Sequence, residues 1–169
     1  MKYVGIFMLF VAAAVLGMIL LAPKEVSVQV NEDINAPIEE VFDAVTNPNK
    51  LVNWVNGVAS VRQIIGDGPG VDAEYKLSFE GEGQMTMTQK VDLFEENNEY
   101  AYTGTVQDFM EVNSRTTFEA LDSNKTRISV YLTMRPLSYK MKMFIYAEET
   151  HKANAAMNNT RLKEYLEKK

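Results

Sequence analysis

The residues of this chain best suited to acid–base chemistry are one histidine and one nearby carboxylate. His151 is the only histidine among 169 residues, and Glu148 precedes it by three positions. On a helix this spacing places both side chains on one face, where the carboxylate can fix the tautomer of the imidazole. The pair could act as a general base or orient a ligand. The simpler alternative is a solvated pair on the helix surface.

The composition excludes several other kinds of site. A single histidine and no cysteine rule out a multi-histidine or thiolate metal site, and no loop carries the clustered carboxylates of an EF-hand. No G-x-S-x-G elbow supports a Ser–His–Asp mechanism. The glycines at 66–70 and 81–83 belong to turns rather than to a phosphate-binding loop before a helix. We expect neither a metal nor a cofactor.

A group of large apolar and aromatic side chains could line a binding cavity. Small-molecule pockets are mostly apolar with a few placed polar groups, and methionine adapts its shape to a ligand. The alternative is that these side chains simply fill the core. Ser114 and Thr116 fall on the inward-facing positions of their expected strand. The candidate ligand-binding residues are Trp54, Tyr75, Phe79, Met85, Met87, Tyr100, Tyr102, Met110, Ser114, Phe118, Met134, Phe144 and His151.

The hydropathy pattern predicts the elements that must position these residues. Alternating apolar and polar residues predict seven strands, at 25–34, 58–65, 71–79, 85–93, 100–102, 110–120 and 128–134. From residue 58 onward short turns join successive strands, which indicates an antiparallel meander. Residues 138–167 contain no glycine or proline and predict one long helix. Its middle is polar, because His151, Asn158 and Asn159 fall on or beside the side expected to be buried.

Two short helices are predicted between the first two strands. Asn35 can cap the first helix, and Pro37 suits its first turn because proline lacks the N–H that would be unpaired there. Asn47 and Pro48 end the first helix and start the second. Trp54, the only tryptophan, closes this unit.

The order of elements resembles the START-like, or Bet v 1-like, superfamily, whose bacterial members include polyketide cyclase/dehydrase-type and SRPBCC domains. The resemblance is carried by Ile34-Asn35-Ala36-Pro37-Ile38-Glu39-Glu40-Val41-Phe42 and by the downstream segment from Asn47-Pro48 to Trp54. It implies an α+β helix-grip fold, in which a curved seven-stranded antiparallel sheet grips the C-terminal helix around an apolar cavity. Members of the superfamily mostly bind lipids, sterols or other hydrophobic small molecules; a few are cyclases, and some modulate partner proteins.

The N-terminal residues form a separate segment. Residues 3–22 are an uninterrupted apolar run, about the length that crosses a ~30 Å hydrocarbon core as a transmembrane helix. Lys2 precedes this run and Glu32 and Asp33 follow it, which predicts a cytoplasmic N-terminus and a domain on the outer (periplasmic or extracellular) side. Secretion after signal-peptide cleavage is the alternative. We expect a membrane anchor at 1–23 and a START-like/SRPBCC domain at 24–169, resembling the membrane-anchored bacterial members.

These observations predict a membrane-tethered binding domain for a hydrophobic or lipid-like small molecule, rather than an enzyme. One alternative is a cyclase/dehydrase- or hydrolase-type enzyme that uses His151 and Glu148 in the same cavity. Another is a domain that regulates a protein partner. The net charge of −6 and the lack of a basic cluster argue against nucleic acid as a partner.

Overall fold

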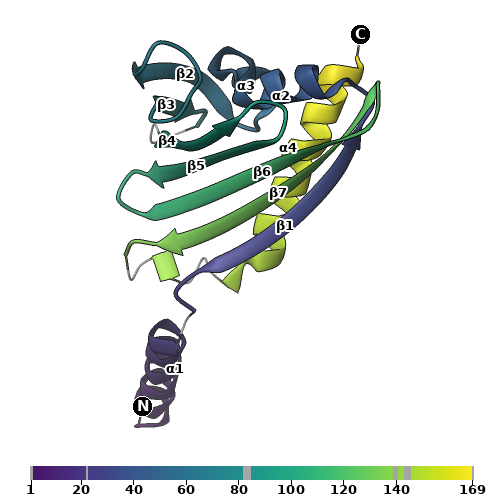
Figure 1. Ribbon diagram of the computed structural model, residues 1–169. Helices are drawn as coiled ribbons and strands as arrows, with labels where there is room; N and C mark the ends of the chain where they lie inside the picture. The colour runs from purple at the N-terminus through teal and green to yellow at the C-terminus, as the bar shows by residue number, and fades with distance from the viewer. Residues whose placement is uncertain (1, 22, 82–84, 139–140, 143–145, 169) are drawn as a thin grey trace.

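The computed structural model describes residues 2–21, 23–81, 85–138, 141–142 and 146–168 (Figure 1). Its elements follow the order α1 (Lys2–Leu21), β1 (Val26–Ile34), α2 (Ile38–Thr46), α3 (Pro48–Trp54), β2 (Val58–Ile65), β3 (Glu74–Phe79), β4 (Thr86–Glu95), β5 (Glu99–Val106), β6 (Met110–Asp122), β7 (Lys125–Pro136) and α4 (Glu148–Glu167). The seven strands form one sheet in the order β1-β7-β6-β5-β4-β3-β2. Each neighbouring pair is antiparallel, which confirms the predicted α+β architecture.

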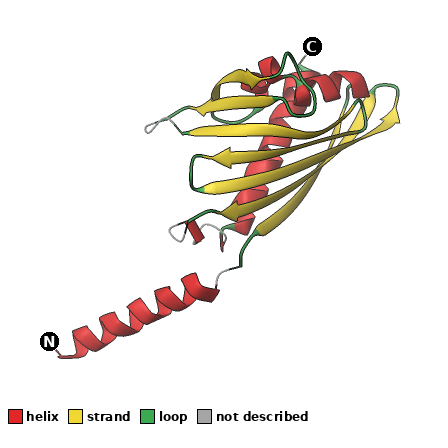
Figure 2. Ribbon diagram, turned by 60° about the vertical axis from the view of Figure 1, so that its left-hand side comes forward, coloured by secondary structure: helices red, strands yellow, loops and turns green. Residues whose placement is uncertain are grey.

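The sheet curves around α4 (Figures 1 and 2). Its buried residues alternate with exposed ones along β1 and β4. In β1, Val26, Val28 and Val30 are buried while the residues between them are exposed. This period of two is what a strand with one covered face requires. From α4, Leu162 and Leu166 are buried in the core. Burial of apolar area between the helix and the sheet therefore holds the two layers together.

The two short helices form as predicted, but the first helix begins differently. Pro37 is the N-cap of α2 rather than a residue of its first turn, and no side chain caps the helix. Asn35 lies two residues before the N-cap and does not cap the helix. Its backbone N–H donates to Glu167 Oε1 at 2.7 Å. For α3 the prediction holds, since the Asn47 side chain accepts a bond from Asn49 N at 3.1 Å. Trp54 closes α3, as expected, and its Nε1 donates to the carbonyl of Ala44 in α2 at 2.9 Å.

The final helix is shorter than predicted, and the fifth strand is longer than predicted. Helix α4 begins at Glu148, not near residue 138, although no glycine or proline interrupts the segment. The residues of this segment that the structure describes, Ser138, Met141, Lys142, Tyr146 and Ala147, lie outside the α-helix. Strand β5 extends to Val106, well past the predicted end at Tyr102. It continues across Gly104, where a Cβ atom would lie 2.9 Å from Met87 Sδ, so this glycine makes room for an inward-facing methionine.

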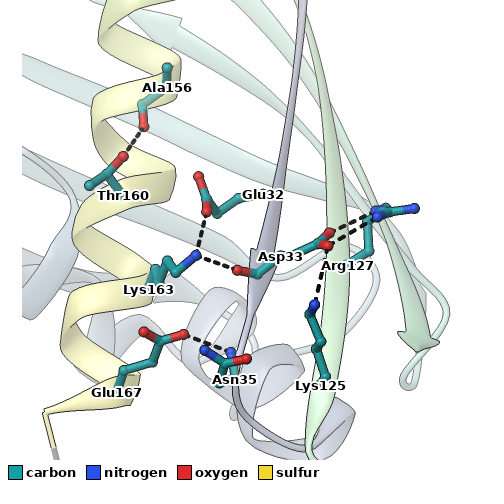
Figure 3. Close-up of polar contacts among 9 residues, drawn as sticks. All are labelled: Glu32, Asp33, Asn35, Lys125, Arg127, Ala156, Thr160, Lys163 and Glu167. Atoms are coloured by element: carbon teal, nitrogen blue, oxygen red, sulfur yellow. Dashed lines mark hydrogen bonds and ion pairs between the residues drawn. The ribbon is translucent and has the colours of Figure 1, made fainter. Parts of the chain in front are cut away.

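A group of polar contacts fixes the C-terminal half of α4 to the end of β1 (Figure 3). Lys163 Nζ donates to Glu32 Oε1 at 2.9 Å and to the carbonyl oxygen of Asp33 at 2.7 Å. With the bond from Asn35 N to Glu167, these contacts form what we call the β1–α4 clamp: Glu32, Asp33, Asn35, Lys163 and Glu167. The clamp ties the helix to the joint between β1 and α2, and so sets where α4 crosses the sheet.

Asp33 links the clamp to the neighbouring strand β7. Its carboxylate accepts two bonds from Arg127, at 2.7 and 3.0 Å, and lies 3.7 Å from Lys125 Nζ. The hydrogen bond from Arg127 is the main reason that the pKa of Asp33 lies below its usual value, and burial opposes this shift. Asp33 is therefore held in its charged form.

Helix α1 contains residues 3–21 of the apolar N-terminal run, and the structure describes exposed large side chains along it, including Phe7, Phe10 and Leu21. The Tyr146 hydroxyl donates to the carbonyl of Met18 at 2.8 Å. Within the described part of the chain, no helix has the combined length and hydropathy of a membrane-spanning helix. The expected transmembrane segment, 3–22, includes residue 22, which lies outside the described residues, and it is not confirmed.

Candidate ligand cavity

A cavity of about 120 Å³ lies between the inner face of the sheet and α4. Aliphatic and aromatic side chains from α2, α3, the strands and α4 form most of its wall, and seven polar side chains interrupt it. Its lining residues are Val45, Leu51, Trp54, Val55, Leu77, Phe79, Met87, Gln89, Tyr100, Tyr102, Ser114, Thr116, Ile128, Val130, Leu132, Ala155, Asn158, Asn159 and Leu162. None of these residues carries a charge. The wall is therefore suited to an uncharged, mainly apolar molecule.

Two pairs of polar side chains from the sheet line this cavity. Gln89 Nε2 donates to the Tyr100 hydroxyl at 2.7 Å, and Ser114 lies opposite Tyr102 on the neighbouring strand. Burial is the main cause that raises the pKa of both Tyr100 and Tyr102 above the usual value. Both phenols consequently stay neutral at physiological pH.

The helix wall of the cavity carries two adjacent asparagines with different surroundings. Asn158 Oδ1 accepts a bond from the backbone N–H of Asn56 at 3.0 Å, which ties α4 to the end of α3. Asn159 is 4 % exposed, and its Nδ2 has no hydrogen-bond partner among the residues that the structure describes. Arg161 Nε donates to the carbonyl of Trp54 at 3.0 Å and adds a second link between the helices. Asn159 therefore lines the cavity with a side-chain N–H group that no described residue accepts.

Six of the predicted ligand-binding residues lie on the cavity wall: Trp54, Phe79, Met87, Tyr100, Tyr102 and Ser114. The other predictions lie elsewhere. Tyr75 and Phe118 belong to the main core, where Phe118 packs edge-on against Phe42 with ring centroids 5.1 Å apart. Met110 and Met134 belong to a second apolar cluster beside β1. Met85 is 44 % exposed just before β4, and Phe144 lies outside the described residues.

The candidate acid–base pair lies at the first turn of α4, away from the cavity wall. Glu148 is exposed and His151 is half-buried, and neither lines the cavity. The cavity contacts the helix only from Ala155 to Leu162, which lies C-terminal to both residues. Among the described residues, no group of three histidine or acidic side chains is arranged to hold a metal ion.

Thr116, which falls on an inward-facing position like Ser114, also lines the cavity, whereas sequence reasoning missed Gln89 and the aliphatic residues as cavity lining and did not name Asn158 or Asn159 as binding residues. Gln89 lies between Met87 and Val91 on the inward-facing positions of β4, so the alternation of that strand could have identified it. Asn158 and Asn159 were already placed on or beside the buried side of the helix. Their polarity at buried positions was the available signal, since buried polar groups in natural proteins nearly always have a hydrogen-bond partner.

A curved antiparallel sheet closed over a long helix around an apolar cavity defines the helix-grip class of α+β domains. The model of the family described as polyketide cyclase / dehydrase and lipid transport matches residues 25–167. The chain belongs to this family. No curated protein sequence gives a significant match.

Solved structures share this fold at low sequence identity. The Zhui aromatase/cyclase from Streptomyces sp. R1128 superposes with a TM-score of 0.70 at 13% identity, covering 85% of this chain and 94% of that one. Ara h 8.0201 gives 0.63 at 17% identity, over 86% of this chain and 99% of that one. XoxI from Bacillus cereus gives 0.64 at 16% identity, over 83% and 94%. These similarities concern the fold alone.

Proposed function

We propose that this protein binds a hydrophobic small molecule in the cavity between the sheet and α4, and that it acts as a binding domain rather than an enzyme. The observation that carries the proposal is a largely apolar internal cavity whose wall includes a few placed polar groups, the usual composition of a small-molecule site. The family description, which includes lipid transport, supports the same class of ligand.

An enzymatic role of the cyclase/dehydrase type would need an acid or base that reaches the ligand. The pair considered for it, Glu148 and His151, is not part of the cavity wall. The two phenols that do reach the wall, Tyr100 and Tyr102, have pKa values raised by burial, which makes them poor bases at neutral pH. The geometry therefore favours binding without turnover.

The proposal is tested by native mass spectrometry of the full-length protein after gentle extraction. We expect a bound hydrophobic molecule that is released on denaturation. In Ala155→Phe the new side chain fills the cavity from α4, so the bound mass should disappear. Ala156→Phe is the matched control, because Ala156 is exposed at the next position of the helix. An empty wild-type protein, or equal occupancy in the two variants, would contradict the proposal.

We further propose that the apolar N-terminal segment tethers the protein to a membrane, with the domain on the outer side. In support, the run from 3 to 22 carries no charge, and its exposed large side chains would be costly to leave in water. The positive charge of Lys2 before the run supports the orientation.

For the tether, the measurement is recovery of the protein in the membrane pellet after alkaline carbonate washing. We expect the wild type to stay in the pellet. The double variant Val11→Lys/Val15→Lys should move to the supernatant, because lysine at the centre of a membrane helix costs roughly 2.5–3.5 kcal/mol. Val71→Lys, at an exposed site outside α1, is the control and should behave as wild type. A wild type found mainly in the supernatant would refute the tether.

A further inference from the structure

One residue of the cavity wall, Asn159, has a buried side-chain nitrogen, Nδ2, without a hydrogen-bond partner among the described residues. By contrast, Gln89 is bonded to Tyr100 at 2.7 Å and Asn158 to Asn56 at 3.0 Å. A buried donor without an acceptor destabilises the folded state. A ligand that supplies an acceptor would remove this penalty only when it is bound.

The wall also restricts the charge of the ligand. Among the residues that line the cavity there is no aspartate, glutamate, lysine, arginine or histidine. An ionised ligand would lose its hydration without gaining an opposite charge, which is strongly unfavourable. The cavity therefore selects for a neutral molecule.

The size of the cavity is the third restriction. Its volume of about 120 Å³ is well below the roughly 300–1,000 Å³ of pockets for drug-sized ligands. A single ring or a short chain fits this space, whereas a diacyl lipid or a multi-ring compound does not. The apolar part of the ligand would contact Trp54, Leu77 and Leu162, which line the same cavity.

We infer that the cavity recognises a compact, neutral, mainly apolar molecule with a carbonyl oxygen, and that Asn159 Nδ2 donates the hydrogen bond that recognises this oxygen. The inference rests on the proposed function and specifies its ligand class. Asn159 is thus the specificity-determining residue of the site, and the remaining wall supplies apolar contact.

The test compares two probes of the same shape, cyclohexanone and methylenecyclohexane, which differ by C=O against C=CH₂. Binding to the full-length protein is followed by the indole N–H signal of Trp54, the only tryptophan, in ¹H–¹⁵N spectra. Asn159→Leu keeps the side-chain volume but removes the donor. In this variant, relative to the wild type, we expect the ratio of the dissociation constant for cyclohexanone to that for methylenecyclohexane to rise by about 3- to 10-fold. The side-chain amide signal of Asn159 should move with cyclohexanone and much less with methylenecyclohexane.

The control variant is Asn154→Leu, the same substitution at an exposed position of α4 outside the cavity wall, and it should leave the ratio unchanged. Thermal unfolding gives an independent readout. Asn159→Leu should raise the melting temperature of the ligand-free protein by about 2–4 °C, because an unpaired buried donor is removed. A lower melting temperature would mean that this amide is already paired in the free protein, and would overturn the inference.

The outcomes separate the inference from the proposed function. If both probes bind and their ratio is the same in wild type and Asn159→Leu, recognition by Asn159 is wrong and the cavity remains a binding site. If neither probe shifts the Trp54 signal, the proposed function and the inference fail together.

Discussion

At the scale of single residues, Gln89 and Tyr100 form a buried hydrogen bond within the apolar cavity wall. Gln89 is 3 % exposed and Tyr100 is also 3 % exposed, so neither can exchange its partner for bulk water. A buried hydrogen bond adds little net stability, but the loss of one partner exposes the full cost of burying the other. These two side chains therefore hold each other in place in the cavity wall.

Gln89→Leu gives a prediction at this scale. It leaves the buried Tyr100 hydroxyl without its donor, and we expect the free energy of unfolding to fall by roughly 1–3 kcal/mol. Urea unfolding measures this change. In the double variant Gln89→Leu/Tyr100→Phe no unpaired group remains, so part of the lost stability should return. If the single variant were as stable as the wild type, the Tyr100 hydroxyl would have another partner, contrary to this account.

At the scale of elements, the position of α4 decides which of its residues line the cavity. The β1–α4 clamp fixes the C-terminal half of the helix through Lys163 and Glu167, and Arg161 and Asn158 fix its middle against the end of α3. The helix consequently presents Ala155 and Asn159 to the sheet. Its first turn, with Glu148 and His151, stays outside the cavity wall.

The stability of the folded protein is expected to depend on pH through the ion pair between Asp33 of β1 and Arg127 of β7. The pKa of Asp33 is lowered in the folded state, chiefly by the hydrogen bond from Arg127. A depressed carboxylate pKa contributes stability above the pKa of the unfolded chain, and this contribution is lost as the pH falls through the folded value. Asp33→Asn should therefore lower the melting temperature at neutral pH, and the difference from wild type should shrink in acid.

The measurement is thermal unfolding of both proteins from neutral to acidic pH. Asp67→Asn, an exposed carboxylate in the turn after β2, is the control and should run parallel to the wild type. The exposure of the Asp33 pair limits the effect, since solvent screens it. A difference between Asp33→Asn and wild type that stays constant over the whole range would show that Asp33 acts through packing instead of charge.

At the scale of the whole molecule, the domain is a sheet and a helix that enclose a small cavity. The meander of strands, the two short helices and the long final helix could be predicted, because each depends on local hydropathy period and turn residues. The pairing of β1 with β7 joins distant segments and was not predicted. Membership in the polyketide cyclase / dehydrase and lipid transport family agrees with the predicted resemblance. Five of the six predicted cavity residues are large apolar or aromatic side chains, a kind that is visible in the sequence, and the sixth, Ser114, was named for its inward-facing position.

The remaining cavity residues could not be predicted, because they depend on packing between elements distant in the chain. Tyr75 satisfies the same strand alternation as Phe79, yet Tyr75 is enclosed by other core residues and does not line the cavity. Local pattern cannot tell a filled core from a partly empty one, because the difference lies in how closely α4 approaches the sheet. His151 likewise lies on α4 before the part that contacts the cavity, which starts at Ala155, although its spacing from Glu148 suggested a role there.

The central claim, that the cavity binds a small hydrophobic molecule, is tested most directly by the emission of Trp54, which lines the cavity and is the only tryptophan. Titration of the full-length protein with methylenecyclohexane should change this emission to saturation. The change should be absent in Ala155→Phe and unaltered in Ala156→Phe. An emission that does not respond in the wild type, or that responds equally in Ala155→Phe, would contradict the claim.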